Sequence, residues 1–370
     1  MRTTAISEGS LRVGTGAKRF RTLGALGALT VVALAACGGG NPVAKATTGQ
    51  AIGNAFSALE AQPGVKFTIS LDVTPGQLAQ MQKTDGGSGL TKDLASAISA
   101  TSVVIDVHSG HGESLRQAGS KTSPDKNGQF EISLLVNRDT PVDIRVVNQT
   151  LFAKVDAAHL LSSFGQDSGK AAPLTKAASE YNAVVPGIST LAQGGWVSVS
   201  LDQFASIARQ QAKSGALPPT ASLSGSLFKD LGTVFNQNVS FVNAGTHNGR
   251  TEYTITAPVR QLAQQLVPML TKDAGTSASG LSPLVAPLDA GFAKIPAGLK
   301  ATVQLWVQNN KAQELDFDLN QFDHKYAFPV PLKVVIAEGT AVQAPPGAKA
   351  IDLSPIAGLL SRGLAGGVKP

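Results

Sequence analysis

Few polar side chains in this chain are spaced in a way that suits catalysis or metal binding. His108 and His111 stand three positions apart, whereas His159, His247 and His324 are isolated in the sequence. The residues before His108 alternate like a β-strand, in which positions i and i+3 point to opposite faces. Such a pair chelates a metal poorly. We therefore interpret both residues as polar loop histidines and expect no metal site and no cofactor.

The segment Ser226-Leu227-Phe228-Lys229 fits the Ser-x-x-Lys pattern of acylating serine enzymes. That mechanism also uses Ser-Asp-Asn and Lys-Thr-Gly segments, and the sequence contains neither. A helix that exposes one serine and one lysine is the favoured interpretation. The Gly-x-Ser-x-Gly and Gly-x-x-x-x-Gly-Lys patterns are also absent from the sequence.

Two other groups of residues suggest chemistry only weakly. Asp316 and Asp318 share one face of an expected strand, beside Glu314. Paired carboxylates can perform acid–base catalysis, but a solvated strand face is the simpler interpretation. Trp196 and Trp306 could stack on a sugar, but packing of aromatic side chains at a strand explains both better. No catalytic constellation emerges, so we do not expect an enzyme.

Cys37 is the only cysteine and has the most distinctive setting in the chain. It ends the apolar run 23–36, which follows a basic stretch at residues 18–21. This run is shorter than the ~20 residues that span a membrane, but it suits the hydrophobic part of a signal peptide. With Leu34-Ala35-Ala36 before it, Cys37 completes a segment that resembles the lipobox of bacterial lipoproteins.

The lipobox resemblance implies that the signal peptide 1–36 is removed and that the Cys37 sulfur receives a diacylglycerol, with palmitate among the expected acyl groups. The protein would then be lipid-anchored on the extracytoplasmic face of the bacterial cell membrane, with residues 37–48 as a flexible tether. The alternative is a secretory signal in which Cys37 is incidental. Because Cys37 has no second cysteine to pair with, no disulfide forms within the chain.

The charge of the chain depends on this leader. Five of the 31 basic residues and one of the 25 acidic residues lie in residues 1–36. The remainder is close to neutral and gives no reason to expect nucleic acid or an acidic polymer as a partner. We expect a monomer with one domain over residues 49–354 and a flexible C-terminal tail, 355–370.

Alternation of apolar and polar residues predicts about ten β-strands, most clearly in 65–73. Further strands are expected at 103–107, 130–136, 142–146, 151–155, 196–199, 239–241, 252–256, 301–307, 314–319 and 332–337. Turn-forming residues at 137–141, 148–149 and 309–311 indicate hairpins, so successive strands should be antiparallel. The strand-rich regions 65–155 and 239–337 could form two halves of one sheet.

Helical spacing is weaker and is interrupted by loops rich in Gly, Ser and Pro. Helices are expected at 49–62, 90–100, 174–185, 201–213, 227–235 and 259–272. The segment 273–298 is rich in Gly, Ser, Ala and Pro and is expected to be a loop.

The order of these features resembles the actinobacterial LppX/LprG-like envelope lipoproteins, which share the LolA/LolB-type half-barrel. The matching segments are the lipobox, the long strand 65–73, the hairpin 142–156, Gly195–Leu201 and the closing hairpin 303–319. The chain departs from the family at Ser200, where an acid is usual, and in the extra residues around 160–235. The resemblance implies an α+β fold with a strongly curved antiparallel sheet, a half-barrel, and helices packed on its concave side.

The same resemblance implies an apolar cavity between sheet and helices that binds or carries the acyl chains of a lipid or glycolipid. From the residues alone, a filled core remains possible, because alternation does not distinguish the two. The expected apolar lining is Phe67, Ile69, Leu71, Ile132, Leu134, Ile144, Leu305 and Phe317. The alternative is a non-catalytic structural or interaction module of the cell envelope without a ligand. A substrate-binding lipoprotein of an importer is disfavoured, because it usually has parallel sheets.

Overall fold

The computed structural model is built around one large sheet. The residues that it describes are 46–86, 90–119, 127–183, 185–203, 238–261, 264–265, 296–322 and 324–352. The expected helix at 227–235, most of the expected helices at 201–213 and 259–272, and the loop 273–298 up to residue 295 lie outside these residues. The tail 355–370 and the leader 1–36 also lie outside them.

Within the described residues the sheet has 12 strands. They are β1 (Gly64–Leu71), β2 (Thr101–His108), β3 (Gln129–Val136), β4 (Asp139–Val147), β5 (Thr150–Val155), β6 (Val197–Ser200), β7 (Ser240–His247), β8 (Arg250–Pro258), β9 (Lys300–Gln308), β10 (Lys311–Asp318), β11 (Pro331–Glu338) and β12 (Lys349–Ala350).

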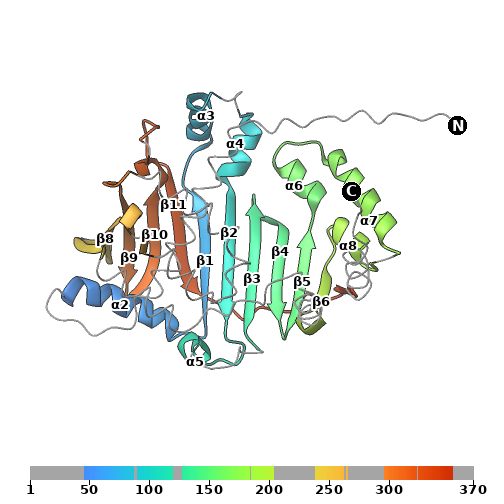
Figure 1. Cartoon of the computed structure of the whole chain (residues 1–370), viewed down its shortest axis with the longest axis horizontal. Coiled ribbons are helices and arrows are strands. Elements are labelled where there is room, and N and C mark those ends of the chain that lie inside the picture. Colours follow the sequence, from blue (N-terminus) through green and yellow to red (C-terminus); the bar gives the residue numbers. More distant parts are fainter. Residues whose placement is uncertain are drawn as a thin grey trace, which may run out of the picture.

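Strand β1 joins the two strand-rich regions of the sequence. It pairs with β2 on one side and with β11 on the other, both antiparallel. The strand order is β12-β6-β5-β4-β3-β2-β1-β11-β10-β9-β8-β7, so the sheet is open, with β12 and β7 at its edges. Figure 1 shows β11, β10 and β9 on one side of β1 and β2–β6 on the other. The α+β fold with a large, curved, antiparallel sheet is confirmed, and the one parallel pair in the described sheet is β6 with β12.

Tight hairpins set the register between neighbouring strands. The turns at Asn137-Arg138, Asn148-Gln149 and Asn309-Asn310 have positive φ at both residues, between 49° and 75°. Positive φ at both central positions defines the turn whose twist matches that of paired strands, and asparagine tolerates it well. The predicted turns are therefore confirmed, and a fourth lies at Asn248-Gly249.

Nine helices lie around the sheet in the described residues, seven α-helical and two 3₁₀. Their bounds are α2 (Ala46–Glu60), α3 (Pro75–Thr84), α4 (Lys92–Ser99), α5 (Leu115–Gly119), α6 (Ala157–Ser163), η2 (Ser168–Ala171), α7 (Ala172–Tyr181) and α8 (Ile188–Ala192), and a second 3₁₀ helix, η4 (Leu319–Phe322), follows β10. In Figure 1, α2 crosses β9 and β10, α3 and α4 lie at one end of the strands, and α5 lies at the other end.

Helix α3 is the clearest helix that alternation did not predict. Thr74 and Gln77 form a capping box, in which the Thr74 hydroxyl accepts a hydrogen bond from the Gln77 amide. In return, the Gln77 side chain accepts one from the Thr74 amide at 2.8 Å. Pro75 occupies the first turn, where its missing N–H costs nothing. Helix α3 therefore begins at Pro75, shortly after β1 ends at Leu71.

Two buried clusters hold these elements together. The larger one packs Ile52, Phe56 and Leu59 of α2 against apolar side chains of β1 and β8–β11. The smaller one packs Leu78 and Met81 of α3 with residues of α4 and of the segment before β11. Within the residues that the structure describes, no helix combines the length and apolarity required to cross a membrane.

Candidate functional site: the apolar face of the sheet

The strand register places all eight predicted lining residues on one face of the sheet, here called the apolar face. Ile144, Ile132 and Phe67 lie in one cross-strand row, linked through Ile105. Side chains directly opposite one another in neighbouring strands point to the same face. The row is therefore a continuous stripe of hydrocarbon across β4, β3, β2 and β1.

Two parallel rows carry the remaining predicted residues. Leu134 and Ile69 are linked through Val103, and the row continues through Val334 and Leu315 to Leu305 of β9. Leu71 lies opposite Leu332, which lies opposite Phe317. The alternation in the sequence was thus sufficient to identify which side chains share a face.

The two halves of this face differ in how they are covered. Leu305 is fully buried and Phe317 is 7% exposed, because α2 packs over β8–β11. Phe67 and Ile69 border this core and are half-buried, and Leu71 borders the smaller cluster. This half of the face is a filled core, in which side chains of α2 occupy the space over the strands.

Strands β2–β5 present a different surface. Ile132, Leu134 and Ile144 are half-buried, as are other apolar side chains of the same face. Those additional side chains, which the sequence interpretation did not include in the lining, are Val103, Ile105, Phe130, Val142, Val146 and Leu151. In the described part of the chain, the two buried clusters draw no side chain from β3, β4 or β5. A broad apolar surface therefore lies next to the filled half of the same face.

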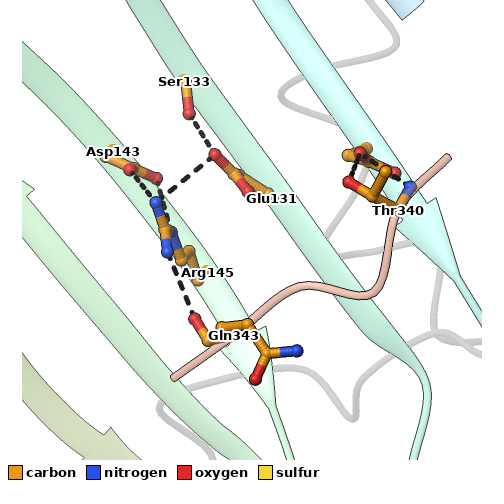
Figure 2. Close-up of polar contacts among 7 residues, drawn as sticks. Glu131, Ser133, Asp143, Arg145, Thr340 and Gln343 are labelled. Carbon is orange, nitrogen blue, oxygen red and sulfur yellow. Dashed lines mark hydrogen bonds and ion pairs between the residues drawn. The ribbon is translucent and has the colours of Figure 1, made fainter. Parts of the chain in front are cut away.

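The opposite face, here called the polar face, carries an ionic network on the same strands. Asp143 is 3% exposed and accepts two hydrogen bonds from the Arg145 guanidinium, at 2.8 and 3.3 Å. Glu131 lies 3.6 Å from the same guanidinium and accepts a hydrogen bond from the Ser133 hydroxyl at 2.7 Å. Figure 2 shows Arg145 between these two carboxylates. The network is absent from the sequence prediction, because charged residues on a polar strand face have no distinctive spacing.

The pKa of Arg145 is raised above its ordinary value. Burial lowers this pKa, but the hydrogen bonds and charge of Asp143 and the charge of Glu131 outweigh burial. The Arg145 guanidinium also lies over the Trp196 ring, 5.0 Å from its centroid. One face of the Trp196 ring is thus in contact with a cation.

A second polar group surrounds Trp306 on β9. The Trp306 indole donates a hydrogen bond to Asp316 at 3.0 Å, and the Arg250 guanidinium lies 4.9 Å from the ring centroid. Glu314 pairs with Arg250 at 3.1 Å and with Lys333 at 3.5 Å. Burial, and then the neighbouring Glu314 charge, raise the pKa of Asp316. These carboxylates are held in ion pairs and hydrogen bonds.

Asp318 does not form a pair with Asp316. Its Oδ1 accepts hydrogen bonds from the backbone amides of Asn320 and Val330, at 2.9 and 2.7 Å. It therefore fixes the turn after β10. The Nδ1 of His108 accepts a hydrogen bond from the Gly110 amide, and the described residues contain no cluster of three metal-ligating side chains.

Two predicted positions lie outside the described residues. They are Cys37, the expected lipidation site, and the Ser226–Lys229 segment. Lipidation therefore stays a prediction.

No protein-family model matches this chain, and no curated protein sequence matches it. A comparison with solved structures finds similarity to the Mycobacterium tuberculosis lipoprotein LppX. The match covers 80% of this chain and 97% of that chain, with 10% sequence identity and a TM-score of 0.30. At that level of superposition it carries no argument about function, which must come from the side chains.

Proposed function

We propose that the chain is a membrane-anchored lipoprotein that binds or carries a lipid or glycolipid through the apolar face of β2–β5. The observation that supports this proposal is the half-buried apolar surface that continues the filled core. Each methylene group moved from water onto such a surface contributes about 0.8 kcal/mol. A long acyl chain can therefore bind without a charged anchor, and the protein needs no catalytic group.

The proposed contacts are assigned according to burial. Ile132, Leu134 and Ile144 are half-buried and lie on strands that contribute no side chain to the two buried clusters of the described residues, so we assign them to the acyl chain. Phe67, Ile69 and Leu71 border that surface. Leu305 and Phe317 support it from the core under α2.

Lipid extraction and native mass spectrometry of the soluble form, residues 38–370, test the proposal. The wild-type protein should release a co-purified lipid, and Ile144→Asn should lose most of it. Val335→Asn is the matched control, because Val335 is 39% exposed and lies on the polar face. The control should keep its lipid.

Circular dichroism must show that both variants are folded. Wild-type protein without lipid, or equal lipid content in both folded variants, would contradict the proposal. Wild-type protein that carries no lipid would favour the alternative function, a structural or interaction module of the cell envelope.

A further inference from the structure

The chain does not turn back into a neighbouring strand after β11. Residues 339–352, here called the strap, cross the polar face of the sheet and end beside β6. Figure 2 shows part of this segment, with Thr340 and Gln343, running across the strands. The final part forms β12, which pairs in parallel with β6 through Lys349 and Ala350.

Three of the strands that the strap crosses, β2, β3 and β4, each contribute a side-chain polar contact to it. The Thr340 amide and hydroxyl both donate to Asp106 of β2 at 3.3 Å. The Val342 amide donates to the side-chain oxygen of Gln129 on β3 at 2.8 Å. Arg145 of β4 donates to the Gln343 carbonyl at 3.2 Å. Three neighbouring strands are thus tied to one backbone segment.

The far end of the strap is fixed by backbone hydrogen bonds. The Lys349 amide donates to the Trp196 carbonyl at 2.9 Å, and the Ile351 amide donates to the Ser198 carbonyl at 2.8 Å. Arg145 contacts both the strap, at the Gln343 carbonyl, and the ring of Trp196, whose own carbonyl binds the far end of the strap.

The strap is packed into the molecule. Val342 is 4% exposed and Ile351 is 7% exposed. A Cβ atom on Gly339 would lie 2.5 Å from the Val65 amide nitrogen and 2.6 Å from an oxygen of Asp106, so this position requires glycine. Apolar burial and close backbone approach therefore add to the polar contacts.

The length of the strap limits how far the strands can spread. From β11 to β12, which contains Lys349, the sheet order contains seven strand-to-strand steps, a path of about 34 Å at ~4.8 Å per step. The segment from 339 to 349 reaches about 36–40 Å when fully extended. It must therefore run largely extended over the strands whose other face carries the half-buried apolar side chains.

We propose that the strap is a clamp that sets the spread of β2–β6 and so controls how firmly the apolar face holds an acyl chain. This inference rests on the proposed function. Detachment of the strap frees the β6 edge and speeds release of the ligand, whereas locking it slows release.

Hydrogen exchange measured by mass spectrometry on the full-length protein tests the clamp itself. Arg145→Lys keeps the charge but cannot bridge Asp143 and the Gln343 carbonyl with a forked group. We expect amide exchange in the strap and β6 to become about tenfold faster, with β8–β10 unchanged. Arg116→Lys is the control, because the Arg116 side chain is 56% exposed and its partners among the described residues, Glu60 and Ser57, both belong to α2. Exchange that is equal in the two variants would overturn the clamp.

A disulfide lock tests the effect on the ligand. Ser198 and Ala350 are register partners of β6 and β12, at a separation that suits a disulfide. In the oxidised Ser198→Cys/Ala350→Cys protein, a bound fluorescent fatty acid should dissociate at least about threefold more slowly than in the reduced protein. Equal dissociation rates would overturn the regulatory role. If neither the oxidised nor the reduced protein binds the fluorescent fatty acid, the proposed function and the regulatory role of the strap are both refuted. The hydrogen-exchange result is independent of the ligand and still decides whether the strap clamps the strands.

Discussion

Leu305→Ala should be among the most destabilising substitutions in this protein. Leu305 is fully buried between its cross-strand partners Tyr253 and Leu315, beneath helix α2. The substitution removes three carbons, which corresponds to about 2.4 kcal/mol of lost transfer free energy. The cavity that remains raises the expected loss to about 3–5 kcal/mol, because the surrounding strands cannot collapse fully.

Ile132→Ala is the matched comparison on the other half of the same face. Its side chain is half-buried and outside both buried clusters, so we expect a loss of about 1 kcal/mol. Urea denaturation followed by circular dichroism measures both losses, with lipid removed beforehand. Equal losses for Leu305→Ala and Ile132→Ala would refute the division of the apolar face into a filled half and a half-buried half.

Three further predictions concern the anchor, the charges and a helix cap. Cys37→Ser should abolish incorporation of radiolabelled palmitate and release the protein from the membrane fraction, and unchanged labelling would exclude Cys37 as the acylation site. The pKa of Asp316 is raised in the folded protein, so folding favours its protonated form. This contribution to stability is fully present below the ordinary pKa of 3.8 and is lost as pH rises through the raised pKa. Asp316→Asn should therefore gain up to about 1 kcal/mol relative to wild type between pH 3 and pH 7 in thermal melts, and a relative loss over that range would contradict the assignment. Thr74→Ala should cost about 1 kcal/mol in urea unfolding through loss of the α3 cap, and no change would show that the capping box contributes nothing.

The residues that make up the apolar face were predictable, because side chains in a strand point to the same face at every second residue. Phe67, Ile132 and Ile144 are far apart in sequence, yet each occupies an apolar position of an alternating segment. The Asn-rich turns then fix the pairing of neighbouring strands, so the three side chains fall in one row.

Which part of the apolar face is packed beneath a helix was not predictable from the sequence. Whether Leu305 or Ile144 is buried depends on where helix α2 packs, which is a long-range contact between α2 and β8–β11. Both residues stand in equally clear alternating segments. Local periodicity reports which face a side chain occupies, and it does not report what lies over that face.

The strap was missed for a different reason. Residues 339–352 contain Gly, Pro and polar residues without helical or strand periodicity. Their attachment depends on side chains of β2, β3 and β4 and on a two-residue parallel pairing with β6. Such contacts carry no signal in a single sequence.

Photo-crosslinking tests the central claim most directly. A fatty acid with a diazirine in its acyl chain would be bound to the protein, irradiated and located by peptide mass spectrometry. We predict adducts on the peptides that contain β2–β5, competed by unlabelled fatty acid, with Ile132, Leu134 or Ile144 among the labelled residues. Absence of competable adducts on these strands would contradict the account.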